Sequence, residues 1–174
     1  MWEAKKPVLP STIPVIPMAK VHELYSKETG EKTIGEDDLR PDEERWICEY
    51  AAKELDCEAV FITEWPSSDM KFYHYADPER PEMAVRADLL FRGVEIVTGS
   101  MREHRYSKLL EQIQKAGGDP ESDGFKYFVS AFKFGMPPHG GFGMGLERVT
   151  QELLGLSNVK EATLFPRDTK RLAP

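Results

Sequence analysis

The spacing of apolar and polar positions changes several times along the chain, and each change predicts a different kind of segment. The first 17 residues carry four prolines separated by β-branched residues: Pro7, Pro10, Pro14 and Pro17. Because proline blocks helix and restricts the residue before it to extended backbone, this part is predicted to be extended. Residues 26–38 are polar and are expected to form an exposed loop. We therefore interpret residues 1–38 as an extended lead-in and loop, and residues 39–174 as the folded portion.

Beyond this segment, helical and strand periodicities follow one another. Pro41 suits the first turn of a helix running to about Leu55, with a buried stripe formed by Trp46, Ile47, Tyr50 and Ala51. Strands are expected at Ala59–Thr63 and within Val85–Met101, with Phe72–Tyr75 as a further candidate, and helices near Arg105–Lys115 and Gly124–Lys133. This order predicts an α+β fold in which an antiparallel sheet is flanked by helices.

Composition and charge restrict the classes of partner. The 174 residues include 40% hydrophobic and 30% charged residues, and no apolar run is long enough to cross a bilayer. A net charge of -7 argues against a broad nucleic-acid-binding surface, so any contact with RNA is expected to be local, with Arg167, Lys170 and Arg171 as the candidate basic patch. The start of the chain lacks a secretory signal pattern, and the two cysteines, Cys48 and Cys57, are expected to be reduced, which predicts a cytoplasmic protein.

Two acids in the segment Arg86–Gly99 are the first candidate for chemistry. In one unbroken strand, Asp88 and Glu95 would lie on opposite faces and about 23 Å apart. If the chain instead reverses around Phe91 and Arg92, Leu90 pairs with Gly93 and Asp88 lies directly opposite Glu95. Since Phe-Arg is a poor two-residue turn, a four-residue loop in the same register is an alternative.

Two facing carboxylates repel unless a cation or a shared proton lies between them. Carboxylate oxygens suit Mg²⁺, which takes one or two carboxylates together with phosphate oxygens and water. Thr98 can add a hydroxyl or position a water. Spacing alone leaves open the alternative of a solvated hairpin with unrelated acids.

A glycine-rich segment, Gly140–Gly145, leads directly into a predicted helix that contains Arg148 in its first turn. Glycines let the backbone approach a flat ligand closely, and the helix that follows presents its N-terminal N–H groups nearby. Arg148 is placed to meet an aromatic ring or a phosphate. Glycines also serve tight packing, and the segment is neither a Walker motif nor a dinucleotide fingerprint, so this pattern alone does not establish nucleotide binding.

Together, these segments resemble a known family. Gly140–Arg148 is similar to the third signature of class II aminoacyl-tRNA synthetases, which ends in Gly-x-Glu-Arg. The flanking Pro137-Pro138-His139 and Leu164–Pro174 resemble archaeal- and eukaryotic-type aspartyl-tRNA synthetases and the related asparaginyl enzymes. Further similarity lies in Arg92–Ile96 with Gly99–His104, and the resemblance runs from about Phe61 to Pro174. It implies the C-terminal part of a class II catalytic fold.

The resemblance also implies roles for individual residues. Asp88, Glu95 and Thr98 would hold Mg²⁺, and Glu95, Gly143, Gly145 and Arg148 would bind ATP. Arg102, with Thr98, Gly99 and His139 around it, would bind the side chain of aspartate or asparagine. Arg102 and Arg148 would be the catalytic residues, with tRNA bound through a longer parent protein that is expected to be a homodimer.

Two earlier signatures of that family do not appear in this sequence: a dimer-interface helix and the antiparallel pair that holds an arginine over the α-phosphate. The chain is therefore expected to be either a piece of a longer synthetase or a shortened paralogue, with little activity alone. Two alternatives remain open at this stage. One is an asparagine synthetase that transfers activated aspartate to ammonia, and the other is a non-catalytic descendant that binds a nucleotide or amino acid or serves as an interaction module.

Overall fold

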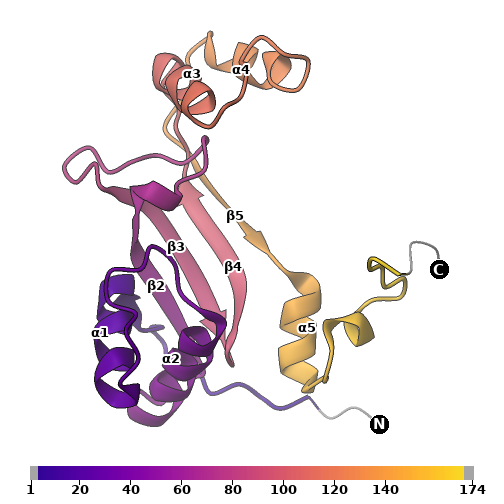
Figure 1. The fold of residues 1–174 in the computed structure, drawn as a ribbon. Coiled ribbons are helices and arrows are strands. Elements are labelled where there is room, and N and C mark those ends of the chain that lie inside the picture. The colour runs from indigo at the N-terminus through magenta and orange to yellow at the C-terminus, as the bar shows by residue number, and fades with distance from the viewer. Residues whose placement is uncertain (1–3, 171–174) are drawn as a thin grey trace.

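A five-stranded sheet organises the chain (Figure 1), and the computed structural model describes residues 4–170. Its spatial order follows the sequence: β1 (Val15–Pro17), β2 (Ala59–Pro66), β3 (Met83–Phe91), β4 (Val94–Met101) and β5 (Gly140–Met144). β1 pairs with β2 in parallel, and every other neighbouring pair is antiparallel. The predicted α+β fold with an antiparallel sheet is confirmed. Residues 171–174 lie outside the described residues. They include Arg171 of the candidate basic patch.

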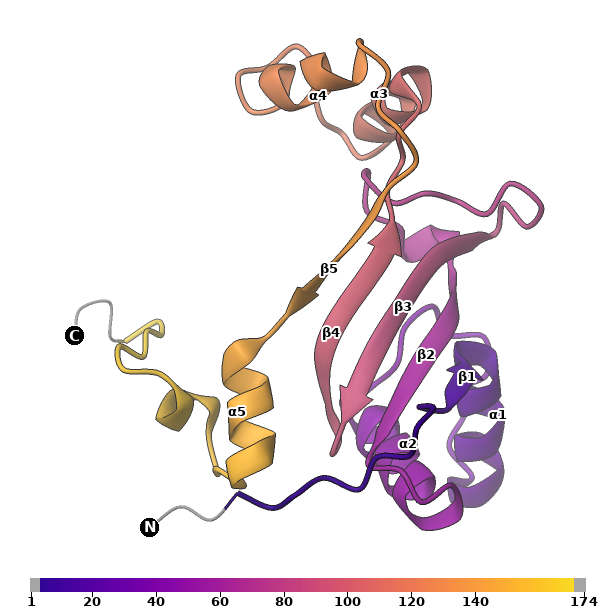
Figure 2. The same ribbon diagram turned by 180° about the vertical axis from the view of Figure 1, so that it is seen from behind.

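Helices surround this sheet unevenly. They are α1 (Met18–Thr29), α2 (Pro41–Glu54), α3 (Tyr106–Lys115), α4 (Lys126–Phe132) and α5 (Leu146–Leu154), with short 3₁₀ turns η1 (Ser67–Asp69) and η2 (Val159–Ala162). α1 and α2 cover one face of β2 and β3, whereas α3 and α4 lie together beyond the end of β4 (Figures 1 and 2). Within residues 4–170, none of the helices combines the length and apolarity needed to cross a membrane.

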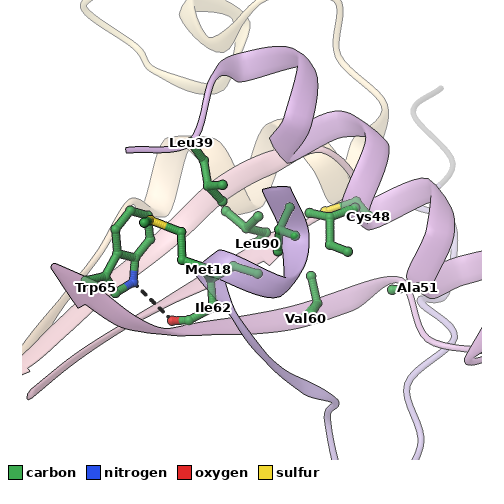
Figure 3. Close-up of a cluster of buried hydrophobic side chains, with 10 residues drawn as sticks. Met18, Leu39, Cys48, Ala51, Val60, Ile62, Trp65 and Leu90 are labelled. Carbon is green, nitrogen blue, oxygen red and sulfur yellow. Dashed lines mark hydrogen bonds between the residues drawn. The ribbon is translucent and has the colours of Figure 1, made fainter. Parts of the chain in front are cut away.

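The main core lies between α1, α2 and the sheet (Figure 3). Ile47 and Ala51 of α2 are fully buried one turn apart, facing Val60 and Ile62 of β2. Burying one such aliphatic side chain contributes roughly 1.5–3 kcal/mol. The predicted helix from Pro41 and the strand from Ala59 are therefore confirmed, and their apolar residues fix how α2 lies on the sheet.

The predicted extended lead-in and loop over residues 1–38 is wrong over Met18–Thr29, which forms α1. Met18, Val21, His22 and Tyr25 have the spacing of one helical face, and all four are buried. Tertiary packing on β2 therefore outweighs the polar residues that alternate with this face. Gly30, at φ 80°, ends the helix in the left-handed conformation that glycine favours.

Residues 72–75 also differ from the sequence-based expectation. They form no strand, and the pairing there is a single bridge between His74 and Arg102. The rings of Phe72 and Tyr73 pack edge to face at 5.1 Å, and Phe72 also packs on Phe125 next to α4. The ring of Phe72 therefore serves packing against the α3–α4 pair.

The register of the β3–β4 hairpin departs from the prediction as well. The turn residues are Arg92 and Gly93, at φ 49° and 92°, so Phe91 pairs with Val94. A β-bulge follows between Leu89 and Leu90, and Asp88 lies opposite Thr98 instead of Glu95. The predicted turn at Phe91–Arg92 is wrong because an Arg-Gly turn with two positive φ angles matches the twist of a tight hairpin.

Candidate functional site

The β-bulge in the hairpin decides which side chains share a face. Three positions apart in a regular strand, Glu95 and Thr98 would point to opposite sides of the sheet. Since Glu95 pairs with Leu90 and Thr98 with Asp88, the bulge returns both to the face covered by α1 and α2. The Thr98 hydroxyl donates a 2.8 Å hydrogen bond to Glu95 Oε1. The candidate site is therefore a row along this face of β4.

Arg102 lies at the far end of that row. Its Nη1 donates to Ser100 Oγ at 2.9 Å, and its guanidinium lies 4.6 Å from the centre of the Tyr73 ring. No ion pair forms between Arg102 and any acid among residues 4–170. It lines a cavity of about 440 Å³ whose apolar wall comes from residues of the α3–α4 region. An unneutralised guanidinium in a partly apolar cavity is suited to bind an anionic or amide group.

His139 borders the same cavity. Its Nδ1 lies 2.9 Å from Pro137 O, and its carbonyl accepts from the Arg102 N–H at 2.9 Å. This backbone bond connects the start of β5 with the end of β4. The structure thus brings two of the residues predicted to bind the amino acid, Arg102 and His139, to one cavity.

Glycines on β5 keep the row accessible. Gly143 pairs with Thr98 and Gly141 with Ser100, so both belong to the same face. A Cβ at Gly143 would meet nothing within 4 Å, and one at Gly141 would lie 3.8 Å from Arg102 Nη2. The surface beside Thr98 is therefore open, as a flat ligand requires.

Arg148 closes the other end of the row from the first turn of α5. Its Nη1 donates to the Glu95 carbonyl at 2.6 Å and lies 3.4 Å from Glu95 Oε1. A Cβ at Gly145 would lie 3.3 Å from Arg148 Cδ, so the glycine gives this side chain room. Gly145 therefore adjoins the arginine directly. Arg148, Glu95 and Glu44 line a second cavity of about 290 Å³.

Glu44 lies in the helix that was predicted from Pro41, but the sequence did not indicate it as a site residue. Burial raises its pKa to about 7, and the neighbouring Glu95 carboxylate acts in the same direction. Both acids reach this cavity from different elements, α2 and β4. Their proximity depends on tertiary packing, and no local pattern in the sequence signals it.

Gly99 is the predicted site residue that the structure does not bring to this face. Its neighbours Thr98 and Ser100 lie on the face of the sheet on which α1 and α2 pack, so Gly99 lies on the opposite face. A Cβ there would lie 3.3 Å from Phe142 Cβ. Gly99 therefore allows close packing of β4 and β5 and does not line the row.

The donor set fits Mg²⁺ at one of the two predicted acids. Glu95 is 31% exposed and has the Thr98 hydroxyl beside it, which suits a hard cation that keeps phosphate and water ligands. Asp88 is 1% exposed, and both of its oxygens contact the Arg86 guanidinium, at 2.6 and 3.3 Å. In the described part of the chain, no three His, Cys, Asp or Glu side chains are grouped to hold a metal ion. The fit therefore holds for Glu95 with Thr98 and fails for Asp88.

Comparison with known proteins places this geometry in a family. The family of class II tRNA synthetases (D, K and N) matches residues 3–169. An aspartate–tRNA(Asp/Asn) ligase of Aeropyrum pernix is 43% identical over all of this chain and 39% of its own length. The corresponding ligase of Thermus thermophilus is 44% identical over 97% of this chain and 38% of its own.

Solved structures agree with these relatives. An aspartyl-tRNA synthetase from Entamoeba histolytica superposes with a TM-score of 0.87 at 29% identity, over 98% of this chain and 34% of that one. An asparaginyl-tRNA synthetase from Pyrococcus horikoshii, complexed with asparaginyl-adenylate, superposes with a TM-score of 0.83 at 34% identity, over 94% of this chain and 36% of that one. The chain thus spans less than two fifths of the length of these relatives. On the family match and the shared fold, this chain belongs to the class II tRNA synthetases of the D, K and N group.

Proposed function

We propose that this chain carries part of a site that activates aspartate or asparagine with ATP and transfers it to tRNA. The relatives named as aspartate–tRNA ligases support the reaction, and the neighbour complexed with asparaginyl-adenylate supports an adenylate as its activated form. The observation that carries the proposal is the row itself. Arg102, which forms no ion pair within residues 4–170, lies at one end, and the Glu95–Arg148 pair lies at the other end of the same face of the sheet.

In this proposal, the two ends of the row bind different groups. Arg102 binds the side-chain carboxylate or amide of the amino acid, with His139 at the edge of the same cavity. Gly143 leaves room for the nucleotide above β5, and Arg148 contacts its ring and terminal phosphate. Glu95 and Thr98 would hold Mg²⁺ against the phosphates. The row thus sets the amino acid and the nucleotide end to end.

The chemistry needs alignment and charge neutralisation more than a strong base. The α-carboxylate of the amino acid attacks the α-phosphate of ATP and pyrophosphate leaves. A 3′-terminal hydroxyl of tRNA then takes the aminoacyl group as an ester, and AMP is released. Arg102 contributes by orienting the amino acid, and Arg148 by neutralising charge on the phosphates. When bound, Mg²⁺ supplies further neutralisation of the phosphates.

Titration calorimetry on the purified 174-residue chain tests the amino-acid end of the row. We expect Arg102→Gln to weaken the binding of aspartate or asparagine about tenfold or more, because a charged hydrogen bond contributes about 1.5–3 kcal/mol. Arg80→Gln is the matched control, since Arg80 forms its ion pairs with Glu64 and Asp77 away from the row. Equal affinities of the two variants, or no heat with either amino acid or ATP, would favour an interaction module without this site.

Activity of the chain alone is expected to be low. The sequence contains no counterpart of the arginine that the resemblance places over the α-phosphate, and one lost donor of this type costs about 2.7–4 kcal/mol. We therefore expect aspartate-dependent pyrophosphate exchange about 10²–10³-fold below that of a full-length relative. Equal rates in the two proteins would contradict this expectation. Formation of asparagine from aspartate and ammonia without tRNA would support the amidation alternative instead.

A further inference from the structure

Arg86 is a cation on the site face that the proposed chemistry does not use. It lies on β3 two residues before Asp88, so both side chains point to the face covered by α1 and α2. Arg86 Nη2 lies 2.6 Å from Asp88 Oδ2, and Arg86 Nε lies 3.3 Å from Oδ1. Two nitrogens of one guanidinium therefore bind both oxygens of one carboxylate, which is the geometry that arginine favours.

Two further contacts hold Arg86 in place. Its Nη1 lies 3.2 Å from Asp69 Oδ2 of η1, and its guanidinium carbon lies 4.1 Å from the centre of the Trp65 ring. The Trp65 ring is itself buried, and its Nε1 donates to the Ile62 carbonyl. With only 11% of its side chain exposed, Arg86 is fixed by a carboxylate on each side and an aromatic face.

Asp88 and Glu95 consequently differ in what each can offer a ligand. Asp88 is 1% exposed and has its counter-charge inside the protein. Glu95 is 31% exposed, and its ion contact is the longer 3.4 Å approach of Arg148. A cation reaching Asp88 would have to displace Arg86 from a buried bidentate pair, whereas one reaching Glu95 meets an accessible carboxylate. The two acids are therefore unequal as metal ligands.

We propose that Arg86 is a positioning residue that serves as the built-in counter-ion of Asp88, so that a divalent cation binds at Glu95 and Thr98 without Asp88 as a ligand. The cation part of this inference rests on the proposed function, and the Arg86–Asp88 part rests on contacts within the chain. The sequence-based assignment of Asp88 and Glu95 as a shared metal pair is thereby replaced by one internal ion pair and one open carboxylate.

The cation part is tested by Mn²⁺ binding in the presence of ATP, measured as the loss of the free-ion electron paramagnetic resonance signal beyond the loss in ATP alone. We expect the double variant Arg86→Gln/Asp88→Asn, which removes both charges of the pair, to change the dissociation constant for Mn²⁺ less than about threefold, and Glu95→Gln to weaken binding at least about tenfold. Arg86→Gln frees the Asp88 carboxylate, so it should tighten Mn²⁺ binding about tenfold or add a second bound ion. The double variant Arg86→Gln/Asp88→Asn should lose that gain. A purely structural role of Arg86 would not change the number of bound ions in this way.

Equal weakening by the double variant and by Glu95→Gln would overturn the inference, because Asp88 would then be a ligand. A wild-type chain that binds no Mn²⁺ would count against the cation site of the proposed function and against the cation part of the inference. Thermal unfolding without metal then decides the remaining part. Arg86→Gln should lower Tm, and adding Asp88→Asn should restore at least half of the loss because it removes the unpaired charge. If the two substitutions lower Tm additively, the counter-ion role is contradicted. Arg86→Lys tests whether a positive charge alone preserves Tm.

Discussion

His74 is a buried residue whose titration follows from its charged surroundings. The residue is 3% exposed. Burial together with Arg86, Arg102 and Lys71 lowers its pKa from 6.5 to about 4, against the weaker opposite effect of Asp69. Between pH 4 and pH 6.5, His74 therefore binds more protons in the unfolded chain than in the folded one. The stability that depends on neutral His74 is therefore complete above pH 6.5 and is lost as the pH falls through about 4.

We expect this histidine to remove up to about 3 kcal/mol from the free energy of unfolding on acidification, at about 1.4 kcal/mol per pKa unit. Urea denaturation at pH 7 and pH 4 measures the loss, and His74→Gln should show a shallower dependence on pH. Nuclear magnetic resonance of the ring protons gives the pKa directly. A measured value near 6.5 would refute the predicted dependence.

For single residues, the sequence predicted site residues within recognisable motifs and missed those whose role depends on a neighbouring side chain. Glu95, Thr98, Arg102 and Arg148 were predicted from motif and resemblance, and the structure gathers them on one face. Arg86 carries no motif, because its position matters only through Asp88 beside it and Asp69 on another element. Which face Gly99 occupies depends on the bulge, and the sequence does not indicate the bulge.

The β3–β4 hairpin depends on a glycine in its turn. Gly93 adopts φ 92°, and a Cβ there would lie 3.1 Å from Arg45 Cγ on α2. Substitution by alanine would combine left-handed backbone strain with crowding of the helix, so we expect Gly93→Ala to lower the free energy of unfolding by about 1–3 kcal/mol. Urea denaturation monitored by tryptophan fluorescence measures the change.

Gly143→Ala is the matched control for this substitution. Gly143 is not in the left-handed region, and a Cβ there meets nothing within 4 Å, so its stability effect should stay within about 0.5 kcal/mol. The same variant should weaken ATP binding, because the added methyl occupies the open surface beside Thr98. If the two alanines destabilise equally, the turn geometry is not the cause.

At the scale of whole elements, apolar spacing predicted most helices and strands. α2 matches its predicted range and β2 begins at the predicted residue, because their apolar residues are buried in one core, although β2 runs on past Thr63 to Pro66. α1 was missed because four buried positions lie among polar ones, and the bulge in the hairpin was missed because it arises from pairing between two strands. Local periodicity therefore predicts an element better than it predicts the register between elements.

For the molecule as a whole, β5 is the element least covered by the described chain. It is the last strand of the sheet, all five of its residues are exposed, and Phe142 and Met144 are 71% and 55% exposed on the face opposite the site. An edge strand with unpaired backbone groups and apolar side chains pairs readily with another strand. We therefore expect the purified 174-residue chain to self-associate as its concentration rises, measured by sedimentation velocity.

Charges placed on the exposed side chains of β5 should suppress this association. Phe142→Lys/Met144→Lys is expected to weaken the association constant about tenfold or more, because lysines oppose edge-to-edge pairing and cannot bury their charges. Ile34→Lys is the control, since Ile34 is also exposed but lies in the loop before α2, away from the sheet edge. A monomer at every concentration, or equal effects of the two charge changes, would show that β5 is not the associating edge. Because the double variant leaves Gly141 and Gly143 in place, ATP binding should persist, which separates the exposed edge from the proposed ligand-binding side of the same strand.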